Sequence, residues 1–491
     1  MSFTGLPGEL LLDIFELAGG GELRMSAAIT FSHLNRACRQ LALSTPSLWS
    51  VLSAHLGADC ATVFARRSQS HSLDIRINGM SRALFAESNN SNTPLPGGLR
   101  DFMSAAVMHF DRCTRLLIEA YFADTLKDMH RHLVNEWRRM QVPPSKVDTV
   151  ILRLRHCEEH PSPAITLAYE SFDYIPFPPR TLELDGVPAW QSEYELCSSS
   201  LEQLVLRNLV FFSLASIPYG GLSIPGTTPS LAQLLDILPN SPYLRKLILD
   251  GATAFDDGYN TIPVGCAQGG RVTMSRLQSI SLAWTSALTA YRLFSMLSTP
   301  ALRSLHLHLE QKDDSDLAWR TLIEFRDPTP LEELYVRMTI NSPVGQRDSP
   351  FARFSNLRVL ELDETQIQNR IVRDLINLPR LRHLALRFEP FISVDALEEC
   401  VLSRLGNDRV CAIEHLEVVH CKNFTPEDET IFEELVPNLT WCADDEEEDG
   451  DYIPYGSDSS SDTMSDSDPD AEVSDSDLRG ITGFTLLLPV D

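Results

Sequence analysis

The residues most suggestive of chemistry form the string His156-Cys157-Glu158-Glu159-His160. Two histidines four residues apart, with a cysteine and carboxylates between them, are side chains that bind zinc. A zinc-protease helix needs a glutamate directly after the first histidine, and a cysteine stands there instead. Prolines follow at positions 161 and 163, so a helix that carries both histidines is not expected. We therefore predict no metal site at this string.

A second set of candidate ligands, His415, His420 and Cys421, lies on or just after a predicted strand. Their spacing predicts core and surface residues of that strand rather than ligands. The sequence has no local signature of a Ser/His/Asp or Cys/His nucleophile, and no glycine-rich phosphate loop follows a strand. We therefore predict no enzymatic activity, no metal and no cofactor. An enzyme of unrecognised type would need a deep pocket with convergent titratable groups.

The composition limits the classes of partner. Of the 491 residues, 43 % are hydrophobic and 22 % are charged, which excludes wholesale disorder, and the length predicts two to four structural units. A formal net charge of −27 argues against nucleic acid and against a polybasic membrane surface. No run approaches the roughly 20 apolar residues of a membrane-spanning helix. The sequence thus predicts no nucleic-acid partner and no membrane.

Cysteine usage and the first residues predict the compartment. Ten irregularly spaced cysteines are too few for a disulfide framework in a chain of this length and read as reduced thiols. The first residues carry no basic stretch, and Glu9, Asp13 and Glu16 interrupt their apolar run, so no signal peptide is expected. The predicted localisation is cytoplasmic or nuclear.

Two short helices are predicted at the start of the sequence. In the first, Leu10, Ile14 and Leu17 share one helical face, and glycines at 19–21 end the helix. A second apolar stretch covers 23–43, and Ser-Thr-Pro-Ser-Leu-Trp follows at 44–49. A helical unit this small is marginal alone and usually completes its core on a partner.

This segment resembles an F-box, especially the variety common in filamentous and mushroom-forming fungi. The resemblance covers about residues 4–52, from Leu-Pro-x-Glu-Leu-Leu-x-x-Ile-Phe at 6–15 to Ala-Leu-Ser-Thr-Pro-Ser-Leu-Trp at 42–49. It implies docking on the small adaptor subunit of an SCF-type cullin–RING ubiquitin ligase and, through the adaptor, on a cullin. Carried over by position, the adaptor contacts would be Leu6, Pro7, Leu10, Ile14 and Phe15. Where the family usually has a tryptophan in the second half, this sequence has Cys38.

One short pattern returns from about residue 111 onwards: apolar, two variable, apolar, one variable, apolar. Eight clear copies begin at Leu201, Leu244, Leu277, Leu302, Leu331, Leu357, Leu381 and Ile413. Their fourth positions are 24–43 residues apart, and several spacings fit the roughly 20–29 residues of leucine-rich repeats. Weaker copies lie around residues 116, 152 and 182. Because one copy cannot bury its own apolar face, we expect an irregular, curved leucine-rich-repeat solenoid. The alternative is an ordinary parallel-sheet α/β domain.

Period-two alternation turns the apolar side chains of each copy inward and the intervening ones outward. Stretches at 290–297 and 371–378 have helical spacing and could return the chain to the next strand. Turn-forming residues at 89–98, 219–230 and 256–270 predict loops. The outward side chains are expected to bind a target protein. The candidates are Arg207, His306, His308, Tyr335, Arg337 and Arg387.

An acidic segment follows the repeats. Residues 443–477 contain fifteen aspartates and glutamates and no lysine or arginine. So polar a segment is predicted to be disordered, and it could fold back on basic strand positions. Five serine or threonine residues of this segment are candidate phosphorylation sites, because an acidic residue follows each of them at the third position. They are Ser459, Thr463, Ser465, Ser467 and Ser474.

Together these features predict an α/β chain with five parts. They are an F-box at 1–52, a connecting region with the first solenoid elements at 53–110, the repeat array at 111–442, the disordered tail at 443–477 and a short apolar segment at 478–491. The predicted function is substrate recognition for an SCF-type ubiquitin ligase, with an unidentified target protein. The alternative is a non-ligase interaction scaffold whose first helices only cap the solenoid.

Overall fold

The computed structural model describes residues 6–18, 24–79, 95–120, 123–141, 147–154, 179–186, 200–207, 234–235, 238–251, 271–309, 319, 322, 330–338 and 349–443. Several predictions lie outside these residues. They concern the His156–His160 string, the loops at 219–230 and 256–270, the acidic segment with its candidate phosphorylation sites, and the segment 478–491.

Three helices come first: α1 (Gly8–Ala18), α2 (Arg24–Leu34) and α3 (Arg36–Ser44). The side chain of Asn35 accepts a hydrogen bond from the backbone N–H of Cys38 (2.8 Å) and so caps α3. A 3-10 turn, η3 (Pro46–Trp49), then carries a tryptophan that is only 1 % exposed. The indole N–H of Trp49 donates to the carbonyl of Ala42 (2.7 Å), and its ring meets Phe64 edge-on.

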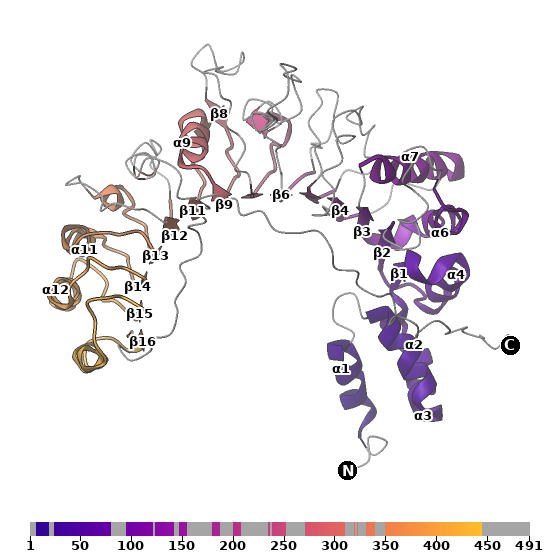
Figure 1. The fold of residues 1–491 in the computed structure, drawn as a ribbon, viewed down its shortest axis with the longest axis horizontal. Coiled ribbons are helices and arrows are strands. Elements are labelled where there is room, and N and C mark those ends of the chain that lie inside the picture. Colours follow the sequence, from indigo (N-terminus) through magenta and orange to yellow (C-terminus); the bar gives the residue numbers. More distant parts are fainter. Residues whose placement is uncertain are drawn as a thin grey trace, which may run out of the picture. The chain divides into compact units, whose positions relative to one another are not determined.

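Fourteen strands of the described residues form one parallel sheet. They are β1 (Val51–Ser53), β2 (Leu73–Asn78), β3 (Cys113–Ala120), β4 (Thr149–Leu154), β5 (Thr181–Asp185), β6 (Gln203–Arg207), β7 (Lys246–Asp250), β9 (Ser279–Thr285), β11 (Ser304–Leu309), β12 (Glu333–Met338), β13 (Val359–Asp363), β14 (His383–Arg387), β15 (His415–Val419) and β16 (Asn438–Cys442). The strands follow one another in chain order (Figure 1). A separate short pair joins β8 (Val272–Thr273) to β10 (Leu297–Ser298).

Neighbouring strands pair so that the repeat positions line up. Leu334 of β12 lies opposite Leu305 of β11 and Leu360 of β13, and the next strands continue the register. The aligned leucines are buried, and they belong to one continuous core cluster. All eight clear copies form strands of this sheet, as predicted, and the weaker copies form β3, β4 and β5.

Helices follow many of the strands: α4 (Gly57–Arg67), α6 (Gly97–Val107), α7 (Ala123–Met140), α9 (Ala287–Met296), α11 (Asn369–Asp374), α12 (Val394–Leu405) and α13 (Glu429–Glu433). Figure 1 shows several of them along one side of the strands. The helical spacing predicted at 290–297 and 371–378 is confirmed by α9 and by α11 with the 3-10 turn after it. Each unit is therefore a strand and a return segment that share one core.

The structure differs from expectation at two places. Strand β1 starts the sheet at Val51, inside the range predicted for the F-box, whereas β2 lies in 53–110, where the first solenoid elements were expected. The turn-forming stretch 89–98 was expected to be a loop, yet Gly97 and Gly98 begin α6 and Leu95 is buried. Leu99, Phe102 and Met103 bury one face of this helix, and that packing outweighs the low helix propensity of two glycines.

Candidate functional site: the outward face of β11–β15

The outward face presents side chains at alternate positions of each strand. In β12, Leu334, Val336 and Met338 are buried in the core, whereas Tyr335 and Arg337 lie on the other face and are partly exposed. Because the strands are parallel and in register, equivalent outward residues form rows across the sheet.

The six predicted target-binding residues lie on four strands. Five of them belong to β11, β12 and β14, which the sheet brings within four consecutive strands. Arg207 is separate, because β7 and β9 stand between its strand β6 and β11. It pairs with Glu183 of β5, with Nε and Oε1 3.5 Å apart. The structure therefore groups five of the six candidates.

The two histidines of β11 each meet an aromatic ring. The rings of His306 and Tyr335 lie 5.8 Å apart between centroids. The ring of His308 lies 4.1 Å from that of Trp284, a residue of β9 that the sequence did not single out. Burial and the nearby Arg337 lower the pKa of His308, so this imidazole is neutral near pH 7.

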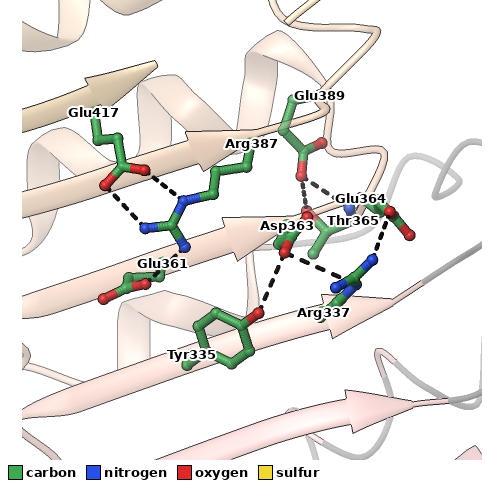
Figure 2. A network of polar contacts seen from close by, with 9 residues as sticks. All are labelled: Tyr335, Arg337, Glu361, Asp363, Glu364, Thr365, Arg387, Glu389 and Glu417. Carbon is green, nitrogen blue, oxygen red and sulfur yellow. Dashed lines mark hydrogen bonds and ion pairs between the residues drawn. The ribbon is translucent and has the colours of Figure 1, made fainter. Parts of the chain in front are cut away.

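Arg387 stands between two carboxylates (Figure 2). Its Nε and Nη2 donate to Glu417 of β15 at 2.5 and 2.8 Å, and its Nη1 donates to Glu361 of β13 at 2.9 Å. The hydrogen bond from Arg387 lowers the pKa of Glu417, and the two carboxylates raise the pKa of Arg387. The guanidinium is thus fully ionised and already paired across three strands.

Arg337 is held in a similar way. Its Nη2 donates to Glu364 at 2.9 Å, and its Nε lies 3.8 Å from Oδ2 of Asp363. The hydroxyl of Tyr335 donates to the same carboxylate at 3.2 Å (Figure 2). Burial, with Asp363 beside it, raises the pKa of Tyr335 to about 12, and burial raises the pKa of Asp363 despite Arg337.

The predicted arginines are therefore not free cations. Arg207, Arg337 and Arg387 each lie beside a carboxylate of a neighbouring strand, and Arg153 of β4 lies 2.7 Å from Asp185. These positions do not present the unpaired positive charge that docking of an acidic segment requires. The residues can offer hydrogen-bond acceptors and ring faces to a partner.

Residues in the left-handed backbone region mark the carboxyl edge of the sheet. They stand two positions after the last apolar position of a repeat copy: Gly186, Gly251, Trp284, Glu364, Phe388 and His420. In five of these the N–H donates to a carbonyl of the next strand, at 2.7–2.9 Å. Only glycine adopts this conformation without strain. An alignment of the repeat copies would have pointed to this left-handed position from sequence alone, because two copies have glycine at it.

A buried carboxylate supports this edge. Glu389, with no exposed surface, accepts hydrogen bonds from the backbone N–H and the hydroxyl of Thr365 and from the N–H of Ile367. It thus fixes the turn after β13, where Glu364 and Gln366 both have positive φ. Burial raises the pKa of Glu389 to about 7, against the lowering effect of its three donors.

The predicted adaptor contacts lie on or just before α1. Leu6 is partly buried against the core, and Pro7 is exposed. Leu10 and Ile14 are 49 % and 37 % exposed. Phe15 is a helical residue whose side chain lies outside the described part of the structure. Leu10 and Ile14 thus share one solvent-facing side of the helix.

The described residues contain no group of histidine, cysteine and carboxylate side chains able to hold a metal ion. Within them His415 is exposed, and Cys421 is buried with its thiol directed at the carbonyl of Leu386 (3.5 Å). None of their helices combines the length and apolar character needed to cross a bilayer.

By its own repeats and strand ladder, the described chain has the architecture of a leucine-rich-repeat solenoid. No model of a known protein family matches it, and no curated protein matches it. It is similar to a crystal structure of an internalin from Listeria monocytogenes, with 11 % identity and a TM-score of 0.33 over 77 % of this chain and 83 % of that one. It is also similar to the mouse RP105/MD-1 complex, with 14 % identity and a TM-score of 0.34 over 79 % of this chain. The match spans 64 % of that second chain.

Proposed function

We propose that this protein is a substrate-recognition subunit of an SCF-type cullin–RING ubiquitin ligase. On this proposal residues 1–52 dock on the adaptor, and the strands that begin in 53–110 and continue through 111–442 bind a target protein. Neither part performs chemistry. Holding the target near a ubiquitin-charged enzyme raises its effective concentration there, which is the whole contribution of such a receptor.

The observation that carries the proposal is the uncovered apolar side of α1. Leu10, Ile14 and Leu17 fall on one face and are 49 %, 37 % and 82 % exposed. Leu11, on the adjoining side of the helix, is 7 % exposed and belongs to the core. One face of the helix therefore packs into the chain's own core, and a second face is open to a partner. Leu10 and Ile14 on the open face are positions where the F-box resemblance implies adaptor contacts.

Binding to the purified adaptor subunit tests the proposal. We expect the full chain to bind, and the double change Leu10→Asp with Ile14→Asp to weaken binding more than tenfold, because two carboxylates would be desolvated in the contact. Leu402→Asp is the matched control: this leucine is 45 % exposed on α12, and its replacement should leave binding unchanged. The proposal fails if wild type does not bind, or if the double variant binds as the control does.

The scaffold alternative has its own support. Ala28, Cys38 and Ala42 are buried in the same cluster as the sheet residues, as expected of helices that cap the solenoid. Limited proteolysis separates the two functions. A docking module should be released as one fragment near residue 52, whereas a fused cap should resist cleavage.

A further inference from the structure

Trp284 is placed at a structural cost. It lies at a β-bulge where the register between β9 and β11 shifts, and it has a φ of 52°. A large aromatic residue in the left-handed region is an outlier that costs on the order of 1–3 kcal/mol. Its ring is nevertheless 51 % exposed and lies against His308. A ring so exposed adds little to the core, so burial of apolar surface does not explain why a tryptophan occupies this position.

Phe388 repeats the arrangement at the other end of the same surface. It has a φ of 55°, its side chain is 39 % exposed, and its ring stacks on His420 at 5.2 Å. At the equivalent positions of β5 and β7 the chain has Gly186 and Gly251. The fold thus accepts glycine at this position, yet two copies present an aromatic ring to solvent.

The surface between the two rings is acidic. On this surface and the adjoining β15, four carboxylates face two guanidiniums among the described residues, so the ion pairs leave two negative charges in surplus. The carboxylates are Glu361, Asp363, Glu364 and Glu417. Because His308 is neutral near pH 7, it adds no opposing charge. Oδ1 of Asp363 is buried and has no hydrogen-bond partner among the residues that the structure describes.

We propose that this surface, which we call the acidic aromatic strip (Trp284, His308, Glu361, Asp363, Glu364, Phe388), binds an extended segment of a partner protein that is rich in lysine or arginine. This inference rests on the proposed function, because it names the class of target. A cation that stacks on Trp284 or Phe388 gains a cation–π contact, and the surplus carboxylates attract the remaining charges.

The spacing of the strands sets the length of that segment. Four strand-to-strand steps separate β9 from β14, which is roughly 19 Å at about 4.8 Å per step. An extended chain advances about 3.3 Å per residue, so about six residues connect the two rings. A lysine or arginine near each end of such a segment can therefore reach both rings at once.

Fluorescence anisotropy with three labelled nine-residue peptides tests the inference on the full chain. The peptides alternate serine with lysine, with glutamine or with glutamate. We expect only the lysine peptide to bind, and its affinity should fall steeply between 50 and 300 mM salt because the attraction is partly electrostatic.

The decisive variants remove a ring without changing the charge. Trp284→Gly and Phe388→Gly suit the positive φ, so the backbone is relieved rather than strained, and each should weaken binding of the lysine peptide at least fivefold. Tyr243→Ala is the control: this ring is 43 % exposed and precedes β7, and its loss should change the affinity less than twofold. Unfolding midpoints of all three variants show whether each is folded.

Some outcomes contradict the inference. If the glycine variants bind the lysine peptide as Tyr243→Ala does, binding reflects only the general acidity of the chain. If the glutamine or glutamate peptide binds equally well, the strip does not select cations. Adaptor binding and peptide binding, both measured on the wild-type chain, separate the two proposals. A wild type that binds the adaptor but not the lysine peptide overturns the target class alone, and one that binds the lysine peptide but not the adaptor overturns the ligase role alone.

Discussion

Replacing Arg404 by methionine is expected to lower the free energy of unfolding by about 3 kcal/mol or more. Arg404 lies in the last turn of α12, and only 1 % of the residue is exposed. Its Nη1 donates to the carbonyls of Leu375 and Leu378 (both 2.9 Å), and its Nη2 donates to those of Leu381 (2.6 Å) and Cys411 (2.7 Å). One guanidinium thus binds four backbone carbonyls, three of them within 375–381 before β14 and one at Cys411 before β15.

The loss of stability is large because methionine cannot replace the hydrogen bonds of the guanidinium. A thioether fills similar volume but donates no hydrogen bond, so buried carbonyls lose partners that water cannot reach. Burial lowers the pKa of Arg404, because removal from water disfavours the charged guanidinium. The fold tolerates a buried cation only because these carbonyls solvate it.

A second arginine in the same helical layer provides the control. Arg373 of α11 pairs with Glu399 of α12 at 2.7 Å, and both side chains are about half exposed. Exposed ion pairs contribute little, so Arg373→Met should change the unfolding free energy by no more than about 0.5 kcal/mol. Urea unfolding followed by tryptophan fluorescence compares the variants. Equal midpoints for the two would show that the Arg404 contacts do not stabilise the fold.

Replacing Glu389 by glutamine is expected to change how stability depends on pH. Burial raises the pKa of this carboxyl to about 7 in the folded state, from 4.5 for an unperturbed glutamate. The folded state therefore holds its proton more tightly than the unfolded state. This group's contribution is greatest below about pH 4.5 and is lost as the pH rises to about 7, by on the order of 3 kcal/mol.

The wild type and Glu389→Gln should accordingly differ in slope. Between pH 5 and pH 8 the wild type should lose stability relative to the variant, whose amide does not titrate. The nearby Asp363, whose pKa burial also raises, contributes a slope of the same sign in both proteins. Exposed Glu427→Gln should keep the wild-type slope. Parallel curves for Glu389→Gln and wild type over this range would contradict the assignment.

The repeat copies show how far local sequence carries a prediction. In Leu331, Leu334 and Val336, apolar residues at one spacing specify a strand with a buried side, and eight such copies predict a stack. The copies cannot reveal β1 and β2, because neither strand has the full spacing of the repeat, and their place in the sheet depends on pairing with their neighbours. Likewise, nothing local distinguishes buried Arg404 from Arg373 of α11, whose side chain is about half exposed.

On the outward face of β11–β15, too, the sequence predicts only part of what the folded sheet shows. The outward placement of Tyr335, Arg337 and Arg387 follows from period-two alternation alone. Their ionic partners do not, because Glu361, Asp363 and Glu417 come from strands that are neighbours only in the folded sheet. The sequence therefore suggests basic positions, whereas the paired network leaves a net acidic surface.

Sequence alone determined the strand repeats, the inward and outward sides of each strand, and the apolar face of α1, because all three depend on residues close together in the chain. Tertiary structure decided which charges are neutralised, which side chains of the N-terminal helices enter the core, and which rings at the strand ends face solvent. Those properties depend on contacts between residues of different elements, and such contacts exist only once the strands and helices have packed together.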